Sequence, residues 1–246
     1  MGDDFWQYRP AQAGDDLRRI DWRRSARSDD AFVQDKEWQI AQTVLLWADN
    51  SQSMTFHSAD ALPTKRDRAR LLALATAILL NKGGERFGLI GGLRSGRGSG
   101  NIEKLAAGLI SDDTADFGTP TDDGLVPQSR MVCISDFLGD LAPLRDLMAK
   151  AVDRNIKGIL VQTLDPQEET FPFYGRTVFT SMTGAMQHET LQASALRTRY
   201  LAKLAARKDA LHQLARSAGW QVVSHHTDQP AMTPLLTIYS ALAHRS

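Results

Sequence analysis

Continuous runs of apolar residues that end next to an acidic residue constrain the fold of this chain more than any other feature. Val44 to Ala48 form one such run, and Asp49 follows it directly. Residues 131–134 form another, which Ser135 and Asp136 follow. A strand that is apolar on both faces is typical of the buried, central part of a parallel sheet. We therefore expect two central strands whose carboxyl ends carry Asp49 and Asp136.

Helical segments alternate with these strands along the chain. A helical period of apolar residues covers 65–81 and stops at two glycines. The other expected elements are strands at 87–90, 158–164 and 220–224 and helices at 101–110, 141–155, 194–218 and 234–244. This alternation predicts an α/β fold with a mostly parallel sheet and helices on both faces. In such sheets, ligands bind beyond the carboxyl ends of the strands.

The chain is expected to form one core domain with an N-terminal arm. Its 246 residues, of which 42% are apolar, suffice for a buried α/β core. Residues 1–40 show no sustained period and carry tryptophans among charged residues, which we interpret as an extended arm packed on a core domain at 41–246. Residues 165–193 break the alternation of the core, and two segments around Thr183-Gly184-Ala185 indicate a hairpin insertion there.

Composition narrows the possible functions. Basic and acidic residues are equal at 29 each, so net charge gives no general attraction to nucleic acid or acidic lipid. The longest apolar run, Leu71 to Leu80, is about half of what a membrane span needs, and the first residues lack the pattern of a signal peptide. The single cysteine, Cys133, cannot form an internal disulfide. We expect a cytoplasmic protein without a membrane span.

The segment Asp49-Asn50-Ser51-Gln52-Ser53 is the strongest candidate for a functional site. A turn after the strand would bring one carboxylate and two hydroxyls to one point, and these hard oxygen donors suit Mg²⁺ or Mn²⁺. With few charged ligands, such an ion retains positive charge and can accept a carboxylate from another molecule. The alternative is an ordinary strand-to-helix turn, because Asp, Asn and Ser are common turn and capping residues.

The chain resembles a known bacterial family. Residues 44–54 look like the first strand and the metal-ion-dependent adhesion site of von Willebrand factor A domains. The block Gly14-Asp15-Asp16-Leu17-Arg18-Arg19-Ile20-Asp21-Trp22, followed by Ser25-Ala26-Arg27, resembles the signature of the domain of unknown function 58 family, and Ile134 to Phe137 match its acidic strand end. The resemblance implies a von Willebrand factor A-like fold and a metal site formed by Asp49, Ser51, Ser53, a threonine of a second loop and Asp136.

The second loop departs from the family pattern. Such domains usually continue from Gly-Thr into a helix, whereas here Gly118 and Thr119 lead almost directly into the next strand. That crossover helix is therefore expected to be missing. Thr119 is the first candidate for the second-loop ligand because a glycine precedes it, and Thr121 is the alternative.

A dense block of charged residues surrounds Ile20 and Trp22 in the N-terminal arm. The sequence does not separate two interpretations of this block. It is either a salt-bridged arm or a docking surface for a partner, since Arg and Trp are frequent in interface hot spots. The residues assigned to partner binding are Arg18, Arg19, Asp21, Trp22 and Arg27.

Two classes of function follow from these features. The favoured one is a non-enzymatic binding module; proteins that look like this chain are associated with MoxR-type AAA+ ATPases, as co-chaperones in the assembly of other complexes. The alternative is a metal-dependent hydrolase that uses the same site. A hydrolase needs a general base near the metal, and His57 and Asp60 are the local candidates.

Overall fold

The computed structural model describes residues 6–11, 20–26, 30–36, 41–111, 113–181, 183–184 and 187–243. The chain divides into an N-terminal unit, 1–41, and an α/β unit, 42–246.

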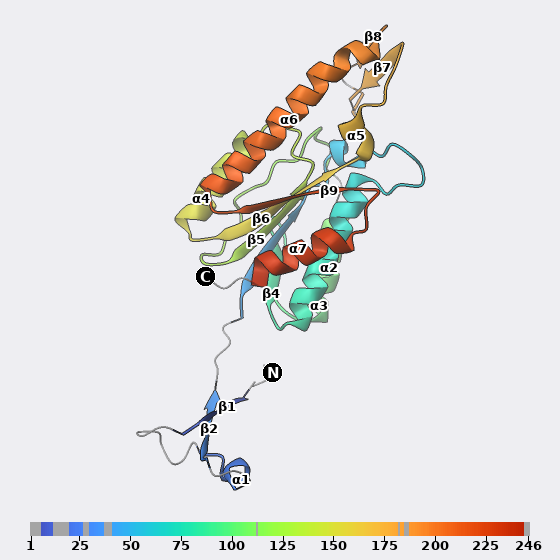
Figure 1. The fold of residues 1–246 in the computed structure, drawn as a ribbon. Helices are drawn as coiled ribbons and strands as arrows, with labels where there is room; N and C mark the ends of the chain where they lie inside the picture. The colour runs from blue at the N-terminus through green and yellow to red at the C-terminus, as the bar shows by residue number, and fades with distance from the viewer. Residues whose placement is uncertain are drawn as a thin grey trace. The chain divides into compact units, whose positions relative to one another are not determined.

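The N-terminal unit contains a two-stranded antiparallel sheet of β1 (Trp6–Pro10) and β2 (Phe32–Lys36) and one short helix, α1 (Trp22–Ser25) (Figure 1). Ser25 ties the helix to the sheet, because its hydroxyl donates to the carbonyl of Asp21 at 2.8 Å and accepts from the backbone N–H of Phe32 at 2.9 Å. The sequence predicted an extended arm packed on the core, and its packing on the core stays a prediction. The two strands and the short helix were not predicted, because residues 1–40 show no sustained period.

The α/β unit is built on a five-stranded, fully parallel sheet with the strand order β4-β3-β5-β6-β9. Its strands are β3 (Thr43–Ala48), β4 (Arg86–Leu89), β5 (Arg130–Ser135), β6 (Lys157–Leu164) and β9 (Gln221–His226). The central strands are β3, β5 and β6, which are the ones with continuous apolar runs. Parallel strands buried on both faces have this composition.

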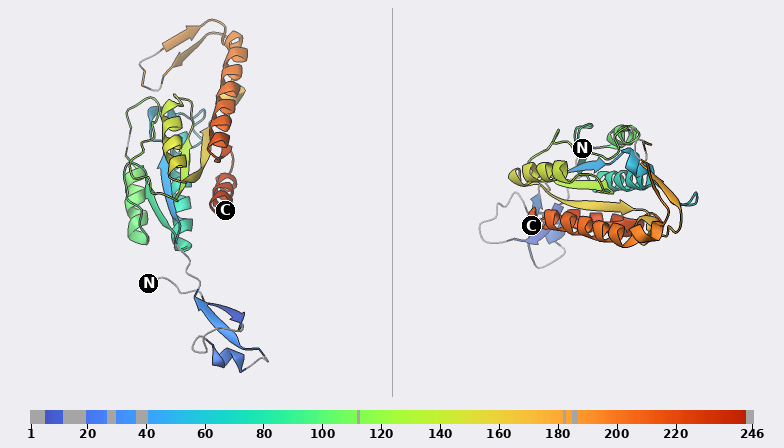
Figure 2. Two further views of the ribbon diagram at one scale, coloured as in Figure 1. Left: turned by 90° about the vertical axis from the view of Figure 1, so that its left-hand side faces the viewer. Right: turned by 90° about the horizontal axis from the view of Figure 1, so that it is seen from above.

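Helices cover both faces of the sheet (Figures 1 and 2). One apolar core joins the sheet to α2 (Lys65–Lys82), α3 (Ser99–Leu109) and α7 (Met232–Ala243). The other joins it to α4 (Ala142–Asp153) and α6 (Ala193–Ser217). Successive residues of β3 alternate between these cores: Leu46 belongs to the first and Leu45 to the second. The predicted α/β fold with helices on both faces is confirmed.

Smaller elements surround the carboxyl edge of the sheet. A 3₁₀ helix, η2 (Gln52–Thr55), follows β3, and a short helix, α5 (Pro166–Thr170), follows β6. The predicted hairpin is present as β7 (Thr177–Thr180) and β8 (Gln187–Thr190), which lie beside the N-terminal half of α6 (Figures 1 and 2).

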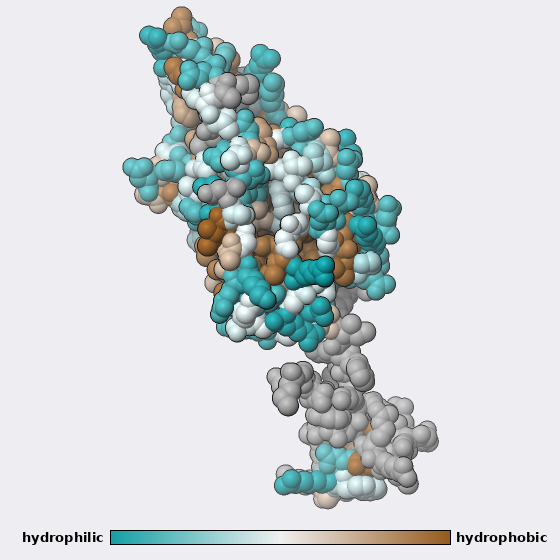
Figure 3. All heavy atoms as spheres, turned by 180° about the vertical axis from the view of Figure 1, so that it is seen from behind, coloured by the Kyte–Doolittle hydropathy of each residue, from teal (hydrophilic) through white to brown (hydrophobic). Residues whose placement is uncertain are grey.

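Between α3 and β5 the described residues, 110–111 and 113–129, form no helix, as expected for a missing crossover helix. On the face of the α/β unit that is turned away in Figure 1, apolar side chains lie at the bottom of a shallow hollow with polar side chains around it (Figure 3). In the part of the chain that the structure describes, no helix is long and apolar enough to span a membrane.

Candidate metal site

Asp49 and Asp136 lie side by side at the carboxyl edge of the sheet. Strands β3 and β5 are paired with Ala48 opposite Ile134, and the backbone N–H of Asp49 donates to the carbonyl of Ile134 at 2.9 Å. Each residue begins the loop that follows its strand, and both are almost fully buried, at 2% and 1% exposure. The structure thus brings these two predicted site residues together, because neighbouring parallel strands end at the same edge.

The first loop, residues 49–53, gathers the predicted oxygen donors. The backbone N–H of Ser51 donates to Oδ1 of Asp49 at 2.8 Å. The hydroxyls of Ser51 and Ser53, both buried, lie 3.3 Å apart. Neighbouring ligands of an octahedral ion with bonds of 2.0–2.1 Å are about 3 Å apart. The separation of the two hydroxyls is therefore close to that of neighbouring ligands of one Mg²⁺ or Mn²⁺ ion.

Ser135 supports Asp49 from the neighbouring strand, a role that the sequence analysis missed. Its hydroxyl donates to Oδ2 of Asp49 at 2.7 Å and accepts from the backbone N–H of Phe137 at 3.0 Å. A serine one residue before an acidic strand end was the available signal. Burial raises the pKa of Asp49, hydrogen bonds from Ser51 and Ser135 partly offset this, and the nearby Asp136 raises it further. A cation beside Asp49 would stabilise its ionised form.

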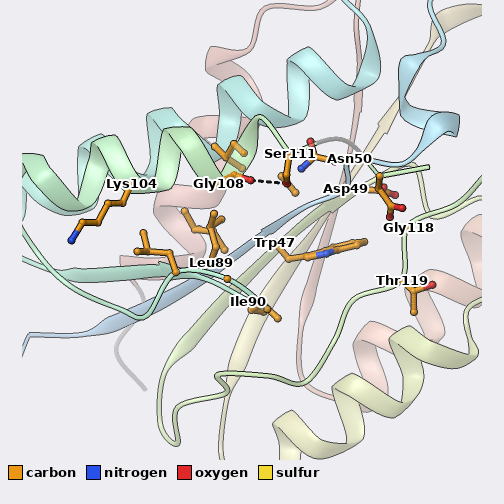
Figure 4. A pocket seen from close by; sticks show the side chains of 17 residues that line it. Trp47, Asp49, Asn50, Leu89, Ile90, Lys104, Gly108, Ser111, Gly118 and Thr119 are labelled. Atoms are coloured by element: carbon orange, nitrogen blue, oxygen red, sulfur yellow. Dashed lines mark hydrogen bonds between the residues drawn. The ribbon is translucent and has the colours of Figure 1, made fainter. Parts of the chain in front are cut away.

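The second loop, residues 113–123, is fastened to the first by main-chain hydrogen bonds. The backbone N–H groups of Gln52 and Ser53 donate to the carbonyls of Ala115 and Asp116 at 2.9 and 2.8 Å. Gly118 lies directly on Asp49: a Cβ added to it would be 2.2 Å from Oδ1 of that carboxylate. Only glycine fits at this position without moving the loop. Gly118 therefore closes one side of the Asp49 carboxylate (Figure 4).

The second-loop threonines lie at the surface rather than on Asp49. Thr119 is exposed and lines a cavity of about 470 Å³ that also reaches Asp49 and Asn50. In Figure 4, Gly118 is the labelled second-loop residue next to Asp49, and Thr119 lies apart from that carboxylate. Thr121 is also exposed, near Gly91. A threonine ligand from this loop stays a prediction, and reaching the first loop would require movement of residues 119–121.

Asp136 is paired with a buried lysine. Nζ of Lys65, at the start of α2, lies 2.8 Å from Oδ2 of Asp136 and 2.6 Å from Oε1 of Glu168. Lys65 is 1% exposed. Burial by itself lowers the pKa of Lys65, but the charges of Asp136 and Glu168 outweigh it and raise the pKa above its usual value. Because Lys65 occupies Oδ2 of Asp136 and the backbone N–H of Leu138 donates to Oδ1 at 3.0 Å, that carboxylate fits a supporting role around a metal ion better than direct ligation.

The sequence analysis treated Lys65 only as the first residue of a helix. The first turn of α2 contains three basic residues, Lys65, Arg66 and Arg68, and one acidic residue, Asp67. Positive charges are unfavourable at a helix N-terminus, where the helix dipole is positive. Three basic residues in that turn were therefore a signal of acidic partners from elsewhere in the fold.

Of the remaining predicted site residues, His57 and Asp60 of the α/β unit and Asp21 and Trp22 of the N-terminal unit lie in the described part of the chain. His57 and Asp60 are exposed, and Nδ1 of His57 is 3.1 Å from the carbonyl oxygen of Ala59. In the N-terminal unit, Trp22 is 63% exposed and Asp21 is half-buried. Arg18, Arg19 and Arg27, the other residues assigned to partner binding, lie outside the described residues.

The described residues contain no group of three or more His, Cys, Asp or Glu side chains that could hold a metal ion. The groups gathered at Asp49 are one carboxylate and serine hydroxyls, so a metal site there would have few charged ligands. Such a set suits a hard divalent cation and not zinc, which takes nitrogen and sulfur ligands.

Comparison with known proteins identifies relatives. The family model described as "Protein of unknown function DUF58" matches residues 7–210. Uncharacterized proteins of Mycobacterium tuberculosis and Mycobacterium bovis are each 28% identical over 234 residues, with 89% of this chain and 73% of the relative covered.

Two solved structures are distantly similar in fold. The SpRpn10 VWA domain is 13% identical, with a TM-score of 0.43 and with 84% of this chain and all of that chain covered. The conserved hypothetical protein BatB from Bacteroides thetaiotaomicron is 13% identical, with a TM-score of 0.42 and with 82% and 99% covered.

Proposed function

The chain belongs to the family described as protein of unknown function DUF58, and we propose that it is a non-enzymatic, metal-dependent protein-binding module. In this proposal Asp49, Ser51 and Ser53 hold Mg²⁺ or Mn²⁺. Asp136 supports the site together with Lys65, and Thr119 or Thr121 joins it if the second loop moves. The ion supplies an electrophilic position for a carboxylate of a partner protein.

One observation carries the proposal: two buried hydroxyls lie 3.3 Å apart beside a buried carboxylate. Buried hydroxyls and carboxylates normally satisfy one another or bind an ion. A single carboxylate among neutral donors leaves a divalent ion with net positive charge, which favours an incoming carboxylate. A cavity of about 470 Å³ is lined by Asp49, Asn50 and Thr119, and in this proposal a partner side chain approaches the ion from it.

The resemblance to the family suggests the partner. We propose a MoxR-type AAA+ ATPase, with which this chain would act on a client protein in the cytoplasm. Net charge is zero, so binding would depend on the local site rather than on general electrostatic attraction.

Metal binding is tested first by titrating Mg²⁺ and Mn²⁺ into the protein in a calorimeter. Asp49→Asn should abolish the heat of binding, because it removes the one charged ligand while retaining the size of the side chain. Asp123→Asn is the matched control, since it removes one negative charge from an exposed residue of the second loop. Equal metal affinity in wild type and Asp49→Asn would refute the site.

Partner binding is tested with a purified MoxR-type ATPase in Mg²⁺ and in EDTA. Binding should require Mg²⁺ and be lost in Asp49→Asn but not in Asp123→Asn. Binding that persists in EDTA would contradict the proposal. The hydrolase alternative predicts instead that p-nitrophenyl phosphate or a related ester is hydrolysed and that Asp49→Asn abolishes this turnover.

A further inference from the structure

A second cavity lies at the same edge of the sheet, on the far side of the Lys65 bridge. Its volume is about 590 Å³, and its lining comes from the chain after η2, from α5, from the hairpin and from α6. Two contacts join the α5 side of this cavity to the chain between η2 and α2. Lys65 binds Glu168, which lines the cavity, and the backbone N–H of Ser58 donates to Asp165 at 2.9 Å. We call this cavity the aromatic pocket.

Four aromatic rings in mutual contact, some edge-on and some face to face, form the wall of the aromatic pocket. The ring of Phe171 lies 5.1 Å from Phe173, 5.7 Å from Phe179 and 4.7 Å from Tyr200, measured between centroids. Phe171 is buried and has a left-handed backbone with φ of 44°, which costs energy for a residue other than glycine. The other three rings are only half-buried. The fold thus holds three aromatic rings partly open to solvent at one place.

Further apolar side chains are exposed around this wall. Tyr174 is 73% exposed, Val178 54% and Leu191 75%. All three belong to the hairpin or to the segments that flank it. None of the three lines the aromatic pocket, but they add exposed apolar side chains to the segment that carries it.

The rim of the aromatic pocket is positively charged. Arg199 and Lys203, both exposed, line it from α6. Over Ala193–Ser217 this helix has six basic residues and one acidic residue, in a chain whose net charge is zero. Among the described residues, neither Arg199 nor Lys203 forms an ion pair, whereas Lys208 on the same helix pairs with Glu169.

The acidic group within the pocket does not cancel this charge. Glu168 is occupied on both oxygens: Oε1 by Lys65 and Oε2 by the backbone N–H of Asp165 at 2.8 Å. Glu189 of the hairpin pairs with Arg176. The exposed rim therefore presents positive charge around an apolar centre.

We propose that the aromatic pocket binds an acidic segment of a partner protein, with one aromatic or branched apolar side chain in the pocket and flanking carboxylates on Arg199 and Lys203. Aromatic pockets with charged rims are the usual form of an interface hot spot. The concave shape fits a single anchoring side chain better than a flat membrane surface. This site is distinct from the candidate metal site and requires no metal ion.

The test uses three fluorescein-labelled hexapeptides, measured by anisotropy against the full chain in EDTA at low salt. Asp-Glu-Ser-Phe-Asp-Glu should bind at least tenfold more tightly than Asp-Glu-Ser-Ala-Asp-Glu, which lacks the anchor, and than Lys-Lys-Ser-Phe-Lys-Lys, which reverses the charge. Changes in the peptide test the anchor without altering the fold of the protein. EDTA separates this result from the outcome for the metal site.

On the protein, Lys203→Glu should weaken binding of the first peptide about tenfold or more. Arg216→Glu is the matched control, because it is an exposed residue of α6 that does not line the pocket, and it should leave the affinity within about twofold. Equal affinity for the phenylalanine and alanine peptides would overturn the proposal. Preference for phosphatidylserine vesicles over all three peptides would overturn it as well, since the surface would then be a membrane contact.

Discussion

Replacing Lys65 by methionine tests whether the buried bridge between Asp136 and Glu168 holds the carboxyl edge of the sheet together. Methionine keeps the length and apolar character of the side chain and removes only the ammonium. Lys65 and Asp136 are each 1% exposed and Glu168 is 13% exposed, so water cannot replace the lost charge. Breaking a buried ion pair by removing one partner costs about 3–5 kcal/mol.

That loss is large compared with the stability of a typical domain, about 5–15 kcal/mol. With a urea m-value of about 2–3 kcal/mol/M, the unfolding midpoint should fall by roughly 1.5 M. Urea unfolding followed by circular dichroism measures it. Lys104→Met removes an exposed lysine and is the control, with an expected change within about 0.5 kcal/mol.

A double-mutant cycle separates the charge effect from packing. In the Lys65→Met background, Glu168→Gln removes one uncompensated carboxylate and should raise the free energy of unfolding by about 1–3 kcal/mol. In the wild-type background the same change should destabilise the protein, because Lys65 loses one of its two partners. A midpoint for Lys65→Met equal to that of Lys104→Met, or a cycle without coupling, would refute the reasoning.

Three further predictions concern the surroundings of the site. Gly118→Ala should cost about 1–3 kcal/mol in urea unfolding and weaken metal binding, because its Cβ would meet the Asp49 carboxylate, whereas Gly100→Ala has open space and should be neutral or slightly stabilising. Burial lowers the pKa of His225 to about 4, below its unfolded value of about 6.5. The neutral imidazole is therefore compatible with the folded state, and the stability that depends on it is present above pH 6.5 and lost as the pH falls towards 4. His225→Gln should therefore reduce the loss of stability between pH 7 and pH 5 by about 1–2 kcal/mol, as measured by urea unfolding at both pH values. Burial also raises the pKa of the Cys133 thiol, so Ellman's reagent should react only at the rate of global unfolding, and fast labelling of the native protein would contradict its buried position.

Most of the sheet could be predicted from the sequence because its central strands contain continuous apolar runs that differ from their surroundings. The runs at β3, β5 and β6 are apolar on both faces, and the helices between them have clear periods. The elements that were missed are short or paired over long distances, such as β1 with β2. Helix α5 has only five residues, although its capping box was present in the sequence as Asp165 and Glu168, three residues apart.

The candidate site was only partly predictable, for a geometric reason. Parallel strand pairing places Asp49 next to Asp136 whatever the loops do, so these two residues followed from the strand assignments. The position of Thr119 depends instead on the course of a loop without regular structure, and no local pattern determines it. The Lys65 bridge joins residues 71 and 103 positions apart, so only the unfavourable charge at the start of α2 pointed to it.

The buried carboxylates at this edge also show where a cation is needed. Asp136 and Glu168 share Lys65, and Asp165 accepts backbone N–H groups from Ser58 and Gln167. Among the described residues, no lysine or arginine contacts Asp49, whose partners are one backbone N–H and serine hydroxyls. A divalent ion bound there should therefore stabilise the folded chain, and Mg²⁺ should raise the unfolding midpoint of wild type and of Lys65→Met alike, but not that of Asp49→Asn. A Mg²⁺ effect that survives in Asp49→Asn would place the ion elsewhere.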